Sequence, residues 1–455
     1  MRYRLKYKPI LLIAAIGLAM IFAAPSMAED LKAGTVINAK NLDQMKSQTF
    51  MGKTIGSMLT EKIEWWIRNH NLELTLKIPE PFPVDPRWVE ATKKYAGEVK
   101  FDPQTRNVTG YKAGLTFPNI TDDDPNKGDK LIWNLYHTGG WPRESFQHIP
   151  LFQFLFISGT TGLEQAQTWI LERIWMTGNL MGDNPVLGDG SIYYKQLIMA
   201  LEPFDIRGVG AFKIRYNDGR ADDSWVYARS VRRTRRLSGG GWFDPIGGTD
   251  ELNDEVSIFS PYPNWFPAYK YLGRRTILAP YCPGEGWDTK ANTYPHIDLK
   301  NAPYWNPKVE WEPREVFMVE ATMPDEHIYS KRIYYIDSEA WVPYFSEAYD
   351  KKNEFVKMML TANKIQYGMQ GPTDIGLRDP LVYAIDWKRM HCTIAAWGDN
   401  WSRNPAMGPD DISVSMTEAI AQGKFQSPVF PPPAIKYEPK YLKDFNLDWS
   451  TYKLK

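Results

Sequence analysis

The chain lacks the motifs on which most enzymes and metal sites depend. It has no GxSxG, HExxH, P-loop or Rossmann glycine pattern. Its six histidines are scattered, and no His/Cys group has the spacing of zinc ligands. The run Asp122–Asp124 lacks the spacing of a calcium loop, so we interpret it as a turn. We therefore predict a non-enzymatic binding protein without catalytic residues, cofactor or metal.

Cysteine and long apolar runs are also scarce. The two cysteines, Cys282 and Cys392, form a candidate disulfide because an exported compartment permits one, but sequence alone does not show that they meet. Beyond the N-terminus, no segment has the roughly 20 consecutive apolar residues of a transmembrane helix. The sequence thus predicts membrane contact that is peripheral at most.

The first 28 residues have the features of a cleaved export signal. An apolar stretch at Ile10–Ala24 precedes the small-x-small site Ser26–Ala28. No cysteine stands at the cleavage point, which excludes a lipoprotein. The basic residues in front of the apolar stretch are Arg2, Arg4, Lys6 and Lys8. We predict a mature chain that begins at Glu29 in the periplasm of a Gram-negative bacterium.

The composition is that of a folded protein rich in aromatic side chains. Hydrophobic residues make up 43% of the chain, charged residues 24% and aromatic residues 14%. Without the signal, which carries four of the 54 basic residues and no acidic residue, the chain has a net charge of minus four. This balance argues against a nucleic-acid partner. The many rings are compatible with a large β-rich core or with the walls of an apolar cavity.

Alternating apolar and polar residues predict a mainly antiparallel sheet. Residues 211–216 and 224–228 are expected to pair around the turn Asn217–Gly219. Two paired strands are expected within residues 108–133, one before and one after the loop Asn119–Asp129. Further strands are expected at residues 72–78, 146–219, 316–323, 331–337, 341–349 and 354–360, the last two forming the final hairpin.

Helices are expected near the N-terminus. Apolar residues recur at helical spacing over Met51–Asn69. A second helix is expected at Arg87–Tyr95, with Asp85 as N-cap, Pro86 at the first position and Gly97 at the end. Near the C-terminus, the stretch Ser427–Pro433 predicts an extended tail.

The segment Trp225–Leu237 combines an aromatic strand with an arginine cluster. Charge on a solvated strand edge, which prevents aggregation, is one interpretation. Contact with a partner or an anionic head group is the other, because arginine binds carboxylate and phosphate in planar geometry. A regular strand would place arginines on both faces, so either this part is not strand throughout or one pair is buried against acids. The arginines are Arg232, Arg233, Arg235 and Arg236, and the acids considered are Asp250, Glu251, Asp254 and Glu255.

An ordered set of motifs resembles the domain of unknown function 1329 family. The motifs are AGTVINAKN at residues 33–41, VEATKKYAGEVKFD at 89–102, YKAGLTFPNITDDDPNKGDKLIWN at 111–134, WVYARSVRRTRRL at 225–237 with DPIGGTDELNDEV after it, and YIDSEAWVPYFSEAYDKKNEFVK at 335–357. That family is similar to the lipoprotein-sorting proteins LolA and LolB and to RseB. The resemblance implies an α+β fold, mainly antiparallel β, in which helices close the concave face of a curved half-barrel around an apolar cavity.

The resemblance also implies a division of the chain and a function. After the signal we expect one integrated domain, with an N-terminal arm and helices at residues 29–110, the half-barrel at 111–370 and a C-terminal extension at 371–455. The expected role is that of a carrier for a lipid, an acyl chain or another hydrophobic cargo, with an envelope transporter or outer-membrane protein as partner. An adaptor without a small ligand and an exported polysaccharide hydrolase stay open as alternatives. Candidate cavity residues are Trp133, Tyr136, Trp225, Tyr227 and Trp242.

Overall fold

The computed structural model describes most of the chain between residues 30 and 398. The described residues are 30–82, 84–138, 146–178, 180, 184–207, 209–228, 233–237, 241–367, 375–398, 447–448 and 453–454. The predicted export signal, the Pro-rich stretch Ser427–Pro433 and Arg232 lie outside them.

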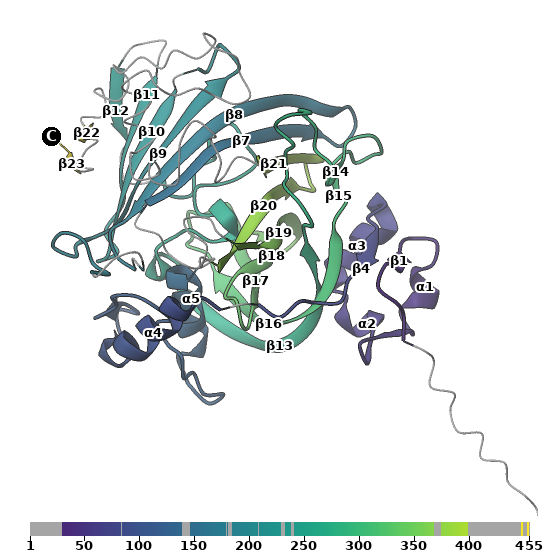
Figure 1. Cartoon of the computed structure of the whole chain (residues 1–455), viewed down its shortest axis with the longest axis horizontal. Helices are drawn as coiled ribbons and strands as arrows, with labels where there is room; N and C mark the ends of the chain where they lie inside the picture. Colours follow the sequence, from purple (N-terminus) through teal and green to yellow (C-terminus); the bar gives the residue numbers. More distant parts are fainter. Residues whose placement is uncertain are drawn as a thin grey trace, which may run out of the picture.

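One large curved sheet dominates the described part of the chain (Figure 1). Neighbouring strands are antiparallel except where β4 meets β16 and where β13 touches β19. In spatial order the strands are β1 (Val36–Ile37), β4 (Leu74–Leu76), β16 (Glu310–Thr322), β17 (Tyr329–Asp337), β18 (Pro343–Asp350), β19 (Phe355–Tyr367), β20 (Ile375–Asp386), β21 (His391–Trp397), β7 (Phe146–Ser158), β8 (Gly162–Trp175), β9 (Ile192–Glu202), β10 (Gly210–Tyr216), β11 (Asp223–Ala228) and β12 (Arg233–Leu237), with β13 (Ala268–Tyr281) beside β16. The α+β class and the curved half-barrel expected from the sequence are confirmed.

Helices and short strand pairs surround this sheet. The helices are α1 (Leu42–Met45), α2 (Ile55–Met58), α3 (Glu61–His70), α4 (Pro86–Tyr95) and α5 (Lys127–Thr138), with short 3-10 turns η1 (Ala96–Glu98), η2 (Val256–Ile258) and η3 (Pro263–Trp265). The short pairs are β2 (Thr49–Phe50) with β3 (Lys53–Thr54), β5 (Lys100–Phe101) with β6 (Val108–Thr109), β14 (Ile297–Asp298) with β15 (Asn306–Pro307), and β22 (Leu447–Asp448) with β23 (Lys453–Leu454). Within the described residues, no helix combines the length and the apolarity that a membrane crossing requires.

The sheet buries apolar side chains on both faces. Along β7, Leu155 and Ile157 enter one core cluster, while Phe154 and Phe156 enter the other, because successive strand residues point to opposite faces. Helices α2 and α3 complete the first cluster, and α5 completes the second by packing against β13 and β16. We call the side of Phe154 the cavity face and the other side the opposite face.

The helix predicted over Met51–Asn69 is wrong in one respect, because the structure has two helices there. Thr60 separates α2 from α3 with an extended backbone at φ −79° and ψ 157°. Its hydroxyl accepts a hydrogen bond from the Ile63 N–H at 3.1 Å, which caps α3. The predicted cap of α4 is confirmed, since the Asp85 carboxylate accepts the Arg87 N–H at 2.8 Å.

The strand expected after the loop Asn119–Asp129 is also wrong. This segment forms helix α5, in which Leu131 and Leu135, like Ile132 and Tyr136, recur at a spacing of four residues and are buried together. A continuous apolar run fits both strand and helix, and the spacing of four decides here for the helix.

The hairpin strands expected in the middle and late parts of the chain are confirmed. Strands β10 and β11 pair antiparallel, as do β16 with β17 and β18 with β19. The segment Trp225–Leu237 does not form a single regular strand, because it contains most of β11 and all of β12, which pair with each other. The hairpin of β18 and β19 is not the final one either. The sheet continues into β20 and β21, and β21 joins β7.

Candidate functional site

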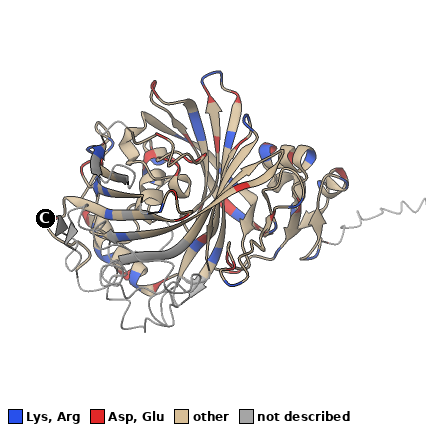
Figure 2. Ribbon diagram, turned by 90° about the horizontal axis from the view of Figure 1, so that it is seen from above, with Lys and Arg blue, Asp and Glu red and all other residues tan. Residues whose placement is uncertain are grey.

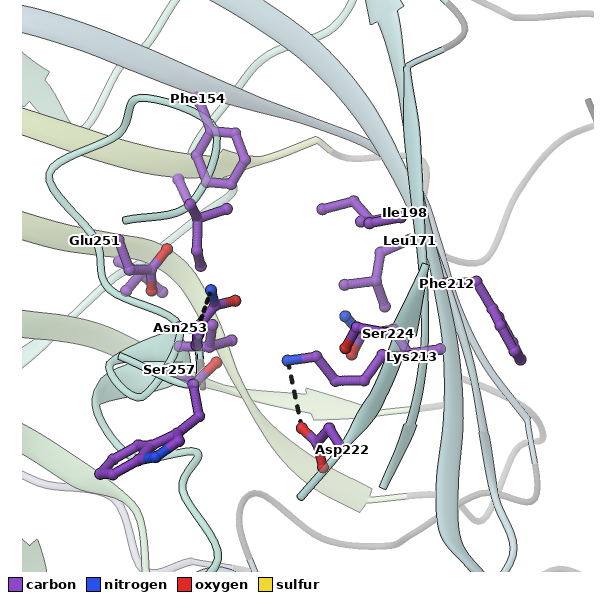
Figure 3. Close-up of a pocket in the computed structure, with 18 of the residues that line it drawn as sticks. Phe154, Leu171, Ile198, Phe212, Lys213, Asp222, Ser224, Glu251, Asn253 and Ser257 are labelled. Carbon is purple, nitrogen blue, oxygen red and sulfur yellow. Dashed lines mark hydrogen bonds and ion pairs between the residues drawn. The ribbon is translucent and has the colours of Figure 1, made fainter. Parts of the chain in front are cut away.

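A cavity lies between the sheet and the segment of residues 241–257, which we call the wall segment (Figure 3). Its volume is about 170 Å³. Strands β7–β12, β20 and β21 form one side, and the wall segment forms the other. Most of the lining is apolar, including Phe154, Leu171, Ile198, Trp242, Val382 and Trp397.

Strand alternation determines which side chains reach this cavity. On β10, Phe212 and Ile214 belong to the core of the opposite face. Lys213 lies between them in sequence and therefore extends to the cavity face, where it lines the cavity. Figure 3 shows this division, with Lys213 reaching inward and Phe212 pointing away.

Polar groups gather at one end of the cavity, around Lys213, Asp222 and Ser224 (Figure 3). Arg215, also on β10, donates two hydrogen bonds to the Asp222 carboxylate, at 2.5 and 2.8 Å. The Lys213 Nζ lies 3.8 Å from the same carboxylate, beyond hydrogen-bond distance. Asp222 is thus neutralised mainly by Arg215, and the Lys213 ammonium faces the cavity.

Glu251 places a carboxyl group in the wall segment. Its side chain lines the cavity and is 6% exposed. Burial, reinforced by the negative charges of Glu255 and Asp379, raises the pKa of Glu251 to about 8, while Lys357 acts in the other direction. At neutral pH this carboxyl is therefore mostly protonated and can donate a hydrogen bond.

Buried ion pairs fasten the wall segment to the sheet. Arg332 of β17 lies 2.7 Å from Asp254 and 3.0 Å from Glu255, and all three side chains are 0% exposed. Lys357 of β19 pairs with Glu255, and His327 lies 3.2 Å from Asp254. The Arg332 guanidinium and the His327 hydrogen bond overcome the effect of burial and lower the pKa of Asp254.

Asp250 fastens the start of the wall segment to β21. Its carboxylate lies 2.5 Å from the His391 Nδ1 and accepts the Thr393 hydroxyl at 2.8 Å. The Asp250 carboxylate raises the pKa of His391 by hydrogen bonding, and Glu164 adds to this shift. The Asp250 N–H in turn donates to the Thr393 hydroxyl at 2.9 Å. These contacts hold one side of the cavity in place.

The structure distributes the predicted cavity residues over several environments. Trp242 lines the cavity. Trp133 and Tyr136 lie on α5 in the core of the cavity face, where the Trp133 indole donates to a backbone carbonyl at 3.0 Å, and neither lines the cavity. Trp225 packs on the opposite face, its ring centroid 5.5 Å from that of Phe212. Tyr227 belongs to β11, and its side chain lies outside the described residues.

Three arginines of the cluster, Arg233, Arg235 and Arg236, belong to strand β12 at one end of the sheet. Arg236 is exposed and forms an ion pair with Asp223. The backbones of Arg233 and Arg235 pair with Ala228 and Val226, and the side chains of both arginines lie outside the described residues.

Three of the four acids considered as partners for these arginines form ion pairs with other residues. Asp254 and Glu255 pair with Arg332, and Asp250 pairs with His391 and, at 3.4 Å, with Arg389. The sequence could not show this pairing because Arg332 and His391 lie 78 and 141 residues away from their partners.

The two cysteines are free thiols, contrary to the candidate disulfide. Cys282 follows β13, and its thiol lies 3.3 Å from the Gly284 carbonyl oxygen. Cys392 lies in β21, paired in register with Ile385 on one side and Ile157 on the other. Burial raises the pKa of Cys282 to about 12 and also raises that of Cys392.

Sequence reasoning missed the polar residues of the cavity. The alternation in AFKIRY, residues 211–216, contains the signal for Lys213, since a lysine between Phe212 and Ile214 must point to the other face. No local pattern marks Asp222 or Glu251 as cavity residues. Figure 2 shows Lys and Arg interspersed with Asp and Glu along the described strands of the sheet.

Comparisons with known proteins give a family and distant structural relatives. A family model described as protein of unknown function (DUF1329) matches residues 36–409. No curated protein is similar in sequence to this chain. A crystal structure of a DUF1329 family protein from Desulfovibrio piger has 15% identity and a TM-score of 0.41, covering 62% of this chain and 99% of that one.

Two further solved structures are similar at the same low level. An outer membrane lipoprotein-sorting protein domain from Vibrio parahaemolyticus has 15% identity and a TM-score of 0.36, covering 54% of this chain and 82% of that one. A LolA superfamily protein from Nitrosomonas europaea has 15% identity and a TM-score of 0.32, covering 57% of this chain and 86% of that one.

Proposed function

This chain belongs to the DUF1329 family of proteins of unknown function, and we propose that it is a non-catalytic carrier that holds a hydrophobic cargo molecule between its sheet and the wall segment. The observation that carries this proposal is the cavity, whose lining is mostly apolar. Apolar contact contributes about 25 cal/mol for each Å² removed from water. Such a site binds by burial and needs no reacting group.

The predicted location is consistent with this role. The export signal at residues 1–28 would deliver the chain to the periplasm. A lipid or a lipid-derived molecule that leaves one membrane must cross water before it reaches another, and an apolar cavity shields its apolar part on the way. We therefore propose handling of hydrophobic cargo in the cell envelope.

Uptake of an apolar fluorescent probe tests the proposal. The wild-type protein is expected to bind the probe with a saturable rise in fluorescence, and native mass spectrometry of gently purified protein is expected to show a bound small molecule. Replacing Ala211, which lines the cavity on β10, with Phe should reduce probe binding by filling space. The matched control is Ala268→Phe, at an exposed position of β13.

The outcomes separate clearly. A wild-type protein that shows a clean apo mass and takes up no probe would contradict the carrier role. Equal loss of probe binding in Ala211→Phe and Ala268→Phe would show that the probe binds elsewhere on the sheet.

A further inference from the structure

The polar end of the cavity has an unbalanced positive charge. Lys213 and Arg215 supply two cations on β10, and Asp222 supplies one anion. Arg215 is 3% exposed at its side chain and is already committed to Asp222 through two hydrogen bonds. The Lys213 ammonium is therefore the cation that a ligand inside the cavity would meet.

A second arginine, Arg173, lies on the same face and acts electrostatically on Asp379. Arg173 of β8 donates to the Gln196 side-chain oxygen at 2.9 Å, and Gln196 lines the cavity. Carboxylates on the wall segment do not cancel the charge. Asp250, Asp254 and Glu255 are paired with cations of the sheet, as described above.

Two acids of the wall segment remain. Asp244 is exposed and does not line the cavity, whereas Glu251 lines it and lies across from Lys213 (Figure 3). Four groups from the surrounding elements face it: Glu255, Lys357, Asp379 and the backbone N–H of Ser257. Two of these are acids, so ionisation of Glu251 would place negative charges close together in a buried site. The surroundings of Glu251 therefore favour its protonated, neutral form. A neutral carboxyl can donate a hydrogen bond to an anion.

The opposite end of the cavity is apolar. Phe154, Leu171 and Ile198 lie there, away from Lys213 (Figure 3). The volume of about 170 Å³ is near the ~150 Å³ of engineered apolar cavities that bind benzene. The cavity therefore accommodates one ring or a short chain.

We propose that the cargo of this cavity is an amphiphile with a singly charged carboxylate head group, which Lys213 binds while the apolar part lies against Phe154, Leu171 and Ile198. This inference rests on the proposed carrier function and adds the chemistry of the cargo. Lys213 and Arg215 share the single carboxylate of Asp222, which leaves one net positive charge at this end to match one negative charge on a ligand. A cationic head group would instead meet the Lys213 ammonium beside a carboxylate that Arg215 already binds.

Three probes that share one apolar body test the head group: phenylpropanoate, phenylpropanol and phenylpropylammonium. Each is titrated into the full-length protein at pH 7 against the apolar fluorescent probe. We expect phenylpropanoate to bind tightest and phenylpropylammonium weakest. Equal binding of the three, or tightest binding of the ammonium compound, would overturn the inference while leaving the carrier function intact. Failure of the wild-type protein to bind any of them or the fluorescent probe would remove the carrier function itself.

Variants connect the selectivity to the named residues. Lys213→Met keeps most of the side-chain stem and removes the charge, so phenylpropanoate should bind about tenfold more weakly or worse, while phenylpropanol changes little. Lys270→Met, at an exposed position of β13, is the matched control and should change neither. A Lys213→Met variant that retains full preference for the carboxylate would contradict the assignment.

The pH dependence provides a readout that a merely structural role would not change. As pH rises through about 8, Glu251 ionises and repels an anionic ligand, so phenylpropanoate should bind more weakly at pH 9 than at pH 7. In Glu251→Gln this weakening should disappear, because glutamine does not ionise. An identical pH profile in wild type and Glu251→Gln would show that Glu251 does not face the bound head group.

Discussion

Replacing Arg332 with Met tests whether buried ion pairs hold the wall segment in place. Arg332 is fully buried and pairs with two carboxylates that are also 0% exposed, Asp254 at 2.7 Å and Glu255 at 3.0 Å. Methionine fills much of the volume but cannot neutralise either acid. Removing one partner of a buried ion pair typically costs about 3–5 kcal/mol, because a charge is left buried without compensation.

The partners that Asp254 and Glu255 keep in Arg332→Met limit the loss of stability to this range. Glu255 keeps its contact with Lys357, and Asp254 keeps His327 at 3.2 Å. We therefore expect Arg332→Met to lower the free energy of unfolding by about 3–5 kcal/mol at pH 7, measured by urea denaturation with fluorescence of the tryptophans. Arg274→Met is the control, because Arg274 pairs with Glu315 where both side chains are about half exposed. An exposed pair of this kind contributes about 0–1 kcal/mol.

The pH dependence of the difference in unfolding free energy between wild type and Arg332→Met identifies the cause of that difference. In the wild type the pKa of Asp254 is lower in the folded state than in the unfolded state. The Arg332–Asp254 pair therefore stabilises the fold at pH values above the pKa that Asp254 has in the unfolded chain. This stabilisation is lost as the pH falls through the pKa that Asp254 has in the folded protein. Without Arg332, burial dominates and raises the pKa of Asp254, so the variant regains stability as acid protonates this group. The gap between the two proteins should thus narrow from pH 8 to pH 5. A loss below about 1 kcal/mol, or a gap that does not depend on pH, would refute the reasoning.

Three further predictions concern titration, packing and redox state. Glu251→Gln should become more stable than wild type as pH rises from 4.5 to 8, by about 1.4 kcal/mol per pH unit, because only the unfolded wild type has released this proton; parallel stability curves in urea would contradict it. Gly128→Ala should destabilise α5 by about 1–3 kcal/mol, since its Cβ would lie 2.4 Å from a carbonyl oxygen of β13, whereas Gly97→Ala has open space and should be neutral within about 0.5 kcal/mol in the same assay. Because Cys282 and Cys392 are free and buried, a reducing agent should leave Tm unchanged and thiol reagents should label them only after denaturation; a drop in Tm under reduction would indicate a bridge.

The sequence was sufficient for those parts of the fold that depend on local patterns. Period-two alternation identifies the pairing of β10 with β11 and of β16 with β17, and the Asp85–Pro86 cap identifies the start of α4. Helix α5 was missed because its apolar residues are nearly continuous, and a continuous run does not separate strand from helix. The pairing of β21 with β7 joins residues more than 230 positions apart, and nothing in either strand specifies that partner.

The cavity shows why its chemistry was harder to predict than its fold. The arginine cluster of β12 was the most concentrated charge in the sequence, yet Arg236 is exposed and already paired with Asp223. Lys213 is a single lysine in an ordinary strand, but burial and the commitment of Asp222 to Arg215 leave its charge facing an apolar space. A charge that faces such a space has more influence than a cluster has in water, because the low dielectric strengthens its field. The selectivity of this cavity should therefore respond more to Lys213 than to any exposed arginine of β12.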